Sequence, residues 1–348
     1  MKKSLLALAV LGAFAGAASA QSSVTIYGSI DLAIAKSNGG TAGNNGGPAG
    51  ASKAWTMQQS NGSRLGFRGN EDLGGGLSAQ FQIEHRYTPD DGNANAVFWA
   101  GRSYVQLSSA TAGRVYLGRE YTPAFWPAVK SDPFGWDGVG QLGSLQWAGY
   151  LAPGNPNGGV RSSNSIGYKT PNMGGLTANA AIGLSETTNV GRNNGLNVEY
   201  GAGPIYAAVG IERITKGTND RRGLVNFALH YDFGVAKLMG YYARAKVGAA
   251  TNAHVGTALE SNKVFSLGVL APVGPGNLKA AVLRLDPEGN NPNGGSNQTT
   301  KYAVGYDYAL SKRSFIYGDV GVTRGGVTAG ATQLTNNNTF ALGVKHTF

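Results

Sequence analysis

The chain has 348 residues, a formal net charge of +10, 55 glycines and no cysteine. The lack of cysteine excludes disulfides and thiolate metal sites. Beyond residue 20, no apolar run reaches the roughly 18 residues of a membrane-spanning helix, which excludes a helical anchor.

The N-terminal segment has the pattern of a cleavable secretory signal. Lys2 and Lys3 form a basic start, 5–15 is mostly apolar, and 18–20 reads Ala-Ser-Ala, a small-residue cleavage site. We therefore expect a signal peptide at 1–20. The mature chain, 21–348, then carries a net charge of +8, because only two lysines are removed.

The segment 63–84 shows the pattern that later segments repeat. In its first arm Leu65 and Phe67 alternate with Arg64 and Arg68. A Gly-rich turn follows, and the second arm alternates apolar residues with Gln and Glu. Alternation with period 2 on both sides of a turn predicts a β-hairpin. Its strongly polar second face fits a closed sheet with water inside and lipid outside better than a soluble sandwich.

Strand candidates follow one another along the chain without a helical interlude. There are about sixteen of them, an even number, as in single-chain bacterial barrels. Their expected ranges are 24–35, 55–69, 77–86, 100–108, 114–118, 163–169, 176–184, 196–200, 205–214, 223–231, 235–245, 263–271, 278–285, 301–309, 314–323 and 339–348.

The connections alternate between short turns and long links rich in glycine and asparagine. The long links are at 36–54, 287–298 and 325–337. They could be disordered linkers between domains, but a strand candidate follows each one directly. The alternation predicts an up-and-down barrel with all long loops on one rim, which is the extracellular rim in outer-membrane barrels.

One strand leaves its register open. Lys237 and Arg244 have opposite parity within 235–245, so one of them must face outward. We expect this to be Lys237, which lies close to a turn, where its aliphatic stem lets the ammonium reach water.

Several ordered motifs resemble the Gram-negative trimeric general porins, in particular the neisserial and Burkholderia-type branch. The matching segments are 23–28, 63–77, 117–119, 164–168 and the terminal Phe348, so the likeness covers the whole mature chain. It implies a 16-stranded antiparallel transmembrane β-barrel with an inward-folded third loop. It also implies a homotrimer in the cell outer membrane that passes small hydrophilic solutes and anions and contacts outer-membrane lipid and lipopolysaccharide. The terminal aromatic resembles the signal read by the barrel-assembly machinery.

The same resemblance assigns an acidic side of the pore constriction to the third loop, at 120–149. Its Asp132-Pro133-Phe134-Gly135 is similar to the Pro-Glu-Phe-Gly found at the loop tip in many porins, but the family's Glu is missing. We expect Asp132 or Asp137 in its place, with Glu120 as a third acid. The loop's aromatic residues are expected to pack it against the inner wall rather than to stack on sugars.

The basic side of the constriction follows from matching positions and, independently, from strand parity. Arg64, Arg102 and Arg161 match the family's wall arginines, and parity turns all three inward together with Lys169. Arg68 is expected beside them. The reverse register would place arginines in lipid at roughly 2–4 kcal/mol each near the midplane. Each arginine could instead be a solvated charge at the rim.

These observations and the resemblance predict a general-diffusion porin that prefers anions. None of the four histidines lies near a Gly-x-Ser-x-Gly elbow or a second histidine at metal spacing. We therefore expect no enzyme, cofactor or metal. Because the basic residues are scattered along an exported chain, we expect no nucleic-acid partner.

Three alternatives remain open at this point. A substrate-specific channel for anionic metabolites would share the fold and the arginines and differ in having a saturable site. An outer-membrane barrel enzyme would need a serine brought beside His230 by the fold. An adhesin or phage receptor built on the exposed loops is compatible with a porin.

We predict that mature protein from the outer membrane begins at Gln21, because cleavage follows the small-residue site that ends at Ala20. Intact-mass measurement or N-terminal sequencing checks this. A chain that retains Met1 would contradict the prediction.

Overall fold

The computed structural model describes residues 22–40, 53–147, 160–186, 192–216, 220–246, 259–289, 298–325 and 335–348. The expected signal peptide at 1–20 lies outside these residues. Within them, no helix is long and apolar enough to cross a membrane.

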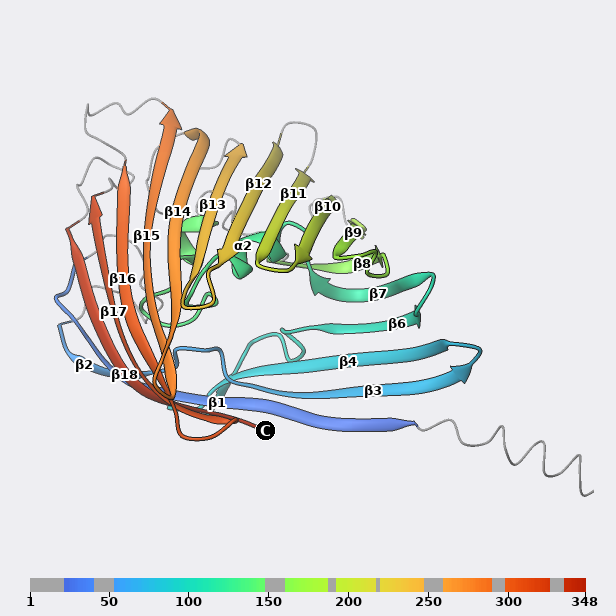
Figure 1. Cartoon of the computed structure of the whole chain (residues 1–348), viewed down its shortest axis with the longest axis horizontal. Helices are drawn as coiled ribbons and strands as arrows, with labels where there is room; N and C mark the ends of the chain where they lie inside the picture. The colour runs from blue at the N-terminus through green and yellow to red at the C-terminus, as the bar shows by residue number, and fades with distance from the viewer. Residues whose placement is uncertain are drawn as a thin grey trace, which may run out of the picture.

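The described part of the chain forms eighteen strands and two short helices (Figure 1). The helices, α2 (Phe125–Lys130) and α3 (Gly143–Gln146), lie between β7 and β8. The strands are β1 (Ser23–Ser37), β2 (Trp55–Gln58), β3 (Arg64–Gly74), β4 (Leu77–Thr88), β5 (Asn93–Ala94), β6 (Ser103–Ser109), β7 (Gly113–Tyr121), β8 (Arg161–Lys169), β9 (Leu176–Gly183), β10 (Arg192–Ala202), β11 (Ile205–Lys216), β12 (Asp220–Asp232), β13 (Lys237–Lys246), β14 (Leu259–Val273), β15 (Gly276–Gly289), β16 (Thr299–Ala309), β17 (Ser314–Gly325) and β18 (Asn337–Thr347).

The strands form one antiparallel sheet that closes on itself between β1 and β18. On its other side, β1 pairs with β3 over Ser23–Ser29 and with β2 over Ala33–Lys36, so β2 and β3 are two parts of one wall strand. The two-residue β5 only extends the end of β4. Sixteen wall strands remain, which confirms the antiparallel 16-stranded barrel.

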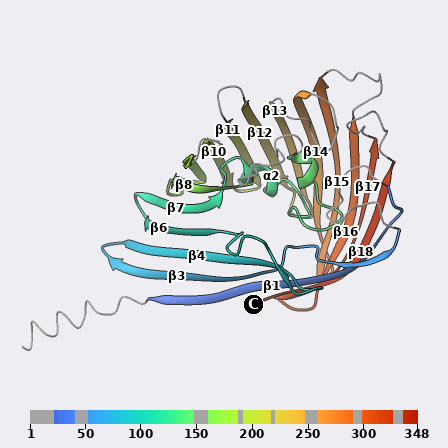
Figure 2. The same cartoon turned by 180° about the vertical axis from the view of Figure 1, so that it is seen from behind.

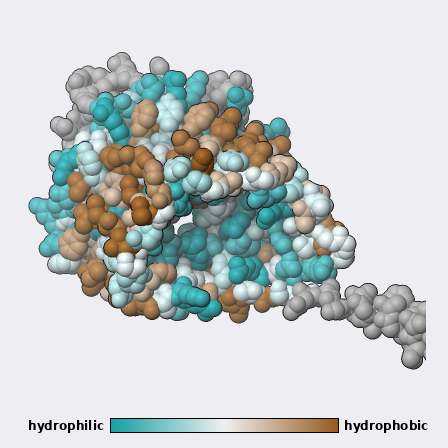
Figure 3. Space-filling view, viewed as in Figure 1, coloured by the Kyte–Doolittle hydropathy of each residue, from teal (hydrophilic) through white to brown (hydrophobic). Residues whose placement is uncertain are grey.

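The two faces of the wall alternate as the sequence predicts. Leu65, Val105 and Ile166 are exposed on the outer face, whereas Glu84 and Gln106 are buried on the inner face. Figure 3 shows hydrophobic residues over the outside of the wall and hydrophilic ones around the opening. Because lipid cannot accept backbone hydrogen bonds, such a closed sheet is one of the two architectures that can span a membrane.

The expected orientation of β13 is wrong. Arg244 shares its face with the exposed Leu238, whereas Met239, Tyr241 and their inner-face neighbours are buried. Arg244 therefore faces outward and Lys237 lies on the opposite face, with its Nζ 3.7 Å from Oδ2 of Asp232 at the end of β12. Burial of the apolar inner residues against the third loop decides the register, and Arg244 tolerates the outer face because it lies near the strand end.

The last residue completes the closure of the barrel. The Phe348 amide donates to the Gly28 carbonyl at 3.1 Å, and the Gly28 amide donates to the Phe348 carbonyl at 3.0 Å. A Cβ atom on Gly28 would lie 2.4 Å from the Arg64 carbonyl oxygen and 2.5 Å from Cζ of the Phe348 ring. Gly28 therefore lets the terminal aromatic ring lie directly on the backbone of β1.

We predict that Gly28→Ala lowers the free energy of unfolding by about 1–3 kcal/mol, because the added methyl group must displace backbone or the Phe348 ring. Urea unfolding of the refolded protein in detergent measures it. The matched control is Gly318→Ala, also on the outer face, where the nearest atom to the new Cβ is 3.9 Å away. Equal effects of the two substitutions would contradict the prediction.

Candidate functional site

The segment 122–147 between β7 and β8 lies inside the ring of strands, as the two opposite views of α2 show (Figures 1 and 2). Its contacts are with inner-face residues of distant strands. The buried Asn226 of β12 donates to the Ala124 carbonyl at 2.7 Å. On another part of the wall, the Gly138 amide donates to the Ser60 carbonyl at 2.9 Å, in the break between β2 and β3. These two contacts tie the segment to separate parts of the inner wall.

A second tie joins the segment to β12. Nε2 of His230 lies 2.9 Å from Oγ of Ser131. The Ser131 hydroxyl donates to the Pro127 carbonyl at 2.7 Å, so it accepts from the imidazole, which carries its proton on Nε2. The fold thus brings a serine to His230, but this serine is fully buried and its hydrogen is committed to the backbone. The pair is an anchor for the loop and not a nucleophile with its base.

The aromatic residues of the segment mostly pack against one another. Phe125 and Trp147 are buried, and Trp136 contacts both edge to face, with ring centroids 4.9 and 5.4 Å away. Trp126 is half-buried, and the ammonium of Lys169 lies 5.3 Å from its ring centre. Phe125 and Trp147 also belong to one buried cluster with Leu224 and Ala228 of the inner wall, so the aromatics pack the loop against this wall as expected.

Asp132 organises the tip of the segment. Its carboxylate accepts hydrogen bonds from the backbone amides of Phe134, Trp136 and Leu142 at 2.8–3.0 Å. Burial raises the pKa of Asp132 to about 6, against the effect of these three donors, which lower it. Because the carboxylate is enclosed by the backbone that it holds, it faces the loop interior and not the lumen.

Asp137 is the acid of the segment that is half-exposed. It accepts a hydrogen bond from the Asn61 amide and lies 3.7 Å from Nζ of Lys345. The buried part of its side chain raises the pKa of Asp137, and the nearby Lys345 opposes this rise. A cavity of about 210 Å³ next to it is lined by four carboxylates and two lysines, namely Asp31, Asp137, Asp307, Asp319, Lys279 and Lys345.

Glu120 lies on β7 and not in the segment. Its carboxylate holds the Arg102 guanidinium by two hydrogen bonds, one of them 2.9 Å long between Nε and Oε1. Nζ of Lys169 lies 3.9 Å from the same carboxylate. Two of the expected wall cations therefore share one buried anion with which they form ion pairs.

A second carboxylate on the wall also forms ion pairs with two arginines. Oε1 of Glu84 lies 2.7 Å from Nη2 of Arg86, and its Oε2 lies 3.9 Å from Nη1 of Arg64. Arg68 is exposed and lies 5.5 Å over the Tyr27 ring. The structure therefore brings Arg64 and Arg86 together around Glu84, and Arg68 is not part of this group.

Arg161 and Arg119 differ from these residues because they have no carboxylate within ion-pair distance in the described part of the chain. Arg161 donates to the Tyr121 hydroxyl at 2.7 Å and lies 4.4 Å over the same ring. Arg119 donates to the Ala100 carbonyl at 3.2 Å and to the Ser163 hydroxyl at 2.9 Å. All these acceptors are neutral, so both positive charges remain uncompensated locally.

Sequence reasoning missed Arg119, which lies one residue beyond the expected strand 114–118. The pairing of β7 with β8 shifts register between Gly118 and Glu120, and Gly118 has a φ of 131°. A β-bulge at this point re-aims the following side chain. The signal in the sequence was the glycine inside a strand, in Leu-Gly-Arg at 117–119, which often marks such a bulge.

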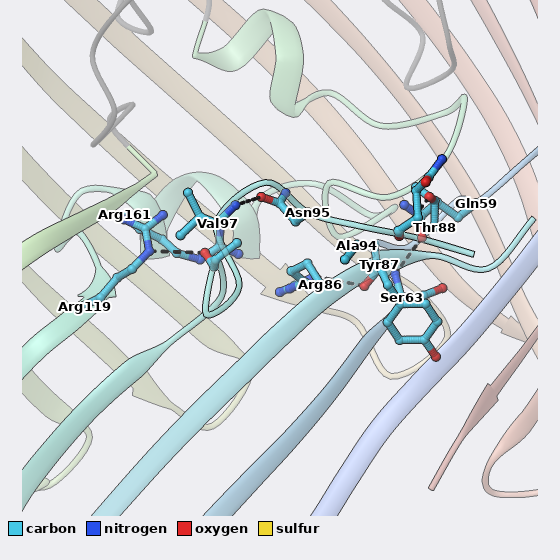
Figure 4. A pocket seen from close by; sticks show the side chains of 13 residues that line it. Gln59, Ser63, Arg86, Tyr87, Thr88, Ala94, Asn95, Val97, Arg119 and Arg161 are labelled. Atoms are coloured by element: carbon cyan, nitrogen blue, oxygen red, sulfur yellow. Dashed lines mark hydrogen bonds between the residues drawn. The ribbon is translucent and has the colours of Figure 1, made fainter. Parts of the chain in front are cut away.

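Three arginines line a lumen cavity of about 480 Å³ (Figure 4). They are Arg86, Arg119 and Arg161, and the remaining lining residues are polar or small, without a carboxylate among those described. Neutral polar residues, among them Gln59 and Asn95, also line it. Such a cavity offers charged and neutral donors to an anion. No cluster of three metal-ligating side chains occurs in the described ranges.

Comparisons with known proteins place this geometry in context. A family model for Gram-negative porins matches residues 7–346. Outer membrane porin protein 32 of Delftia acidovorans is 36% identical over 371 aligned residues that cover 100% of both chains. An outer membrane porin of Bordetella pertussis is 31% identical, covering 91% of this chain and 93% of the relative. Among solved structures, an anion-selective porin from Comamonas acidovorans matches with a TM-score of 0.78 and 28% identity, over 94% of this chain and 100% of that one.

Proposed function

Because the chain belongs to the Gram-negative porin family and is an outer-membrane porin, we propose that its barrel is a general-diffusion channel that prefers anions. Small hydrophilic solutes cross it through the lumen beside the inward segment 122–147, which narrows the pore. As a member of this family the protein is a channel and not an enzyme. The observation that carries the anion preference is the pair of uncompensated arginines, Arg119 and Arg161, at the cavity in the lumen.

The balance of charge on this wall supports the proposal. Six cations stand against two carboxylates, which leaves a local net charge of +4 from Arg64, Arg86, Arg102, Arg119, Arg161 and Lys169 with Glu84 and Glu120. A narrow aqueous pore with low-dielectric walls focuses the field of such charges. An ion a few ångströms from a guanidinium feels on the order of 1–4 kcal/mol before screening.

The acids expected on the loop do not neutralise the positive charge of this wall. Asp132 is enclosed by backbone donors and Glu120 is paired with Arg102. Asp137 belongs to the smaller cavity of about 210 Å³, where four carboxylates face two lysines. We therefore propose a transverse field across the lumen, with anions passing along the arginine side. The relative from Comamonas acidovorans, described as anion-selective, fits this proposal.

We predict that the double variant Arg119→Gln/Arg161→Gln loses most of the chloride preference, because it removes two uncompensated charges near the ion path. Zero-current potential across a planar bilayer with an about tenfold KCl gradient measures it. The matched control is Arg102→Gln/Glu120→Gln, which removes one cation and one anion and is expected to retain the preference. Cation preference in the unmodified protein, or equal losses in the two double variants, would overturn the proposal.

A substrate-specific channel for anionic metabolites is the second candidate. The specific observation in its favour is the cavity of about 480 Å³, which is large enough for a small organic anion and presents three guanidinium groups. In the same bilayers, current block by micromolar phosphorylated or carboxylated metabolites favours a saturable site. Flux that varies only with size and charge favours general diffusion.

We also propose that the protein is a homotrimer whose contacts lie on the outer face of the first and last strands. Exposed apolar side chains on this part of the wall, such as Ile26, Ile34, Leu342 and Val344, support it. We expect a trimer that survives mild detergent, so unheated protein migrates far above the 35.9 kDa of the full chain. Sedimentation as a monomer in several mild detergents would contradict this.

Phe348 is proposed as the residue that the barrel-assembly machinery reads. Phe348 is 40% exposed and follows directly after β18, the strand that closes the barrel. We predict that deleting Phe348 lowers the outer-membrane yield and leaves the conductance of refolded channels nearly unchanged, since the residue lies outside the lumen. Comparing the yield of the deletion strain with that of the parent checks this, and normal yield would count against the role.

A further inference from the structure

Two motifs of the sequence, Leu-Gly-Arg in β7 and Asn-Ser-Ile-Gly-Tyr in β8, meet at one point of the wall. Gly118 lies opposite Ser165, and the next recorded pair is Glu120 with Ser162. Between these two pairs β7 advances by two residues and β8 by three. The pairing of β7 with β6 continues without a shift. The extra residue therefore belongs to β8 and forms a β-bulge.

Asn164 has the backbone conformation that accommodates this extra residue. Its φ is 54°, and Trp136 is the only other non-glycine residue with a positive φ in the described ranges. The Asn164 carbonyl accepts a hydrogen bond at 2.9 Å from the amide of Leu184, directly after β9. Across the bulge, the Ser165 hydroxyl donates to the Ser162 carbonyl at 3.1 Å. The bulge is therefore closed by hydrogen bonds on both sides of Asn164.

The side chain of Asn164 contributes little to this arrangement. It is exposed and forms no hydrogen bond within the part of the chain that the structure describes. Asparagine tolerates left-handed backbone better than most residues, and β-branched residues tolerate it least. What the residue supplies is therefore its backbone conformation, which glycine adopts equally well.

The extra residue decides which face of β8 carries Arg161. Side chains of a regular strand alternate, so without the bulge Arg161 would share the face of Ser165 and, through the pairing, that of Glu120. With the bulge, Arg161 lies opposite Tyr121 and donates to its hydroxyl at 2.7 Å. One inserted residue thus moves the guanidinium from the face of a carboxylate to the face of a phenol.

The bulge also provides a neutral acceptor for Arg119. Ser163 and Asn164 together lie opposite Arg119, which is the residue between the two recorded pairs. The Ser163 hydroxyl accepts from Nη1 of Arg119 at 2.9 Å. Arg119 and Arg161 therefore come to line the same cavity, as Figure 4 shows.

The face of Glu120 is the face on which cations of this region are compensated. Nζ of Lys169, also on β8, lies 3.9 Å from the Glu120 carboxylate. Arg102 donates to the same carboxylate from β7's other neighbour. An arginine at position 161 on this face would become a third cation around one anion. On the face of Tyr121 it meets a neutral acceptor and keeps its charge uncompensated.

We propose that Asn164 is a positioning residue of the pore. Its left-handed backbone holds the bulge and keeps Arg161 on the face of Arg119, away from Glu120, although Asn164 itself contacts no ion. Its effect on ion preference rests on the proposed function, in which Arg119 and Arg161 carry that preference. Its effect on the register of β8 does not depend on what the channel conducts.

Cross-linking of introduced cysteines in the refolded full chain tests the register. The chain has no cysteine, so the pair Tyr121→Cys/Arg161→Cys reports the register without background. Directly opposite residues of an antiparallel pair have Cα atoms about 4.5–5.5 Å apart, within the range that a disulfide bridges. We expect this pair to cross-link under mild oxidation. Adding Asn164→Val is expected to lower the cross-linked fraction about tenfold, because valine disfavours left-handed backbone.

Two control variants separate the backbone conformation from other effects. Asn164→Gly keeps the left-handed backbone without the side chain and is expected to cross-link as the parent does. Asn194→Val makes the same exchange at an exposed position of β10 where φ is not positive, and it is expected to have no effect. Asn164→Ala, a milder change in the same direction, is measured if the valine variant does not refold. Equal cross-linking with valine or alanine and with glycine at position 164 would overturn the positioning role.

Ion preference of the Asn164 variants, with Tyr121 and Arg161 intact, tests the consequence. In planar bilayers with a KCl gradient, Asn164→Val is expected to lose about as much chloride preference as Arg161→Gln does, and Asn164→Gly is expected to lose none. Combining Asn164→Val with Arg161→Gln is expected to add little, because Glu120 then already neutralises the arginine. Fully additive losses would contradict this route.

The two measurements separate this inference from the proposed function. An unmodified channel without chloride preference, in which cross-linking still depends on Asn164, would refute the anion preference alone. Cross-linking that depends on Asn164 while Asn164→Val keeps the full preference would overturn the link between the bulge and selectivity. Cross-linking that is independent of Asn164 would overturn the positioning role whatever the ion preference.

Discussion

Closure of the sheet is the constraint on which the rest of the structure depends. In lipid, every backbone donor and acceptor of a strand must find a partner in a neighbouring strand, so an open edge between β1 and β18 would be costly. The register of Ser29–Ser37 with Thr339–Thr347, and the reciprocal hydrogen bonds of Gly28 and Phe348, remove that edge. With the wall closed, period-2 alternation sorts every side chain into a lipid face or a lumen face.

The electrostatic field in the lumen depends on which groups the carboxylates of the inward segment and of the wall contact. The Asp132 carboxylate accepts hydrogen bonds from three backbone amides. It therefore stabilises the tip of the loop and adds little to the field in the pore. On the wall, Glu84 and Glu120 each form ion pairs with two cations, and these ion pairs fix the directions of the Arg86 and Arg102 side chains. These carboxylates therefore position other residues. The positive charges of Arg119 and Arg161 stay without a carboxylate partner among the described residues and can attract an anionic solute.

The basic surplus of the chain is divided between the two faces of the barrel. Inside, it collects around the cavity of Arg86, Arg119 and Arg161. Outside, Arg213, Arg244 and Lys246 line one groove on the outer wall. The two collections share one physical feature, cations beside neutral donors or apolar surface, but they meet different media. The charges inside meet the water of the lumen, and those outside meet the lipid interface.

By itself the sequence determined the alternating faces, the sixteen wall strands and the inward direction of Arg64, Arg102 and Arg161, because strand parity is a local property with a strict period of 2. Only the tertiary structure decided which charges are compensated. The bulge at Gly118 turned Arg119 inward, Glu120 proved to be the partner of Arg102, and Arg244 rather than Lys237 faced outward. Each of these outcomes depends on the register between strands and on packing against the inward segment, which no single strand contains, since one shifted residue exchanges the two faces.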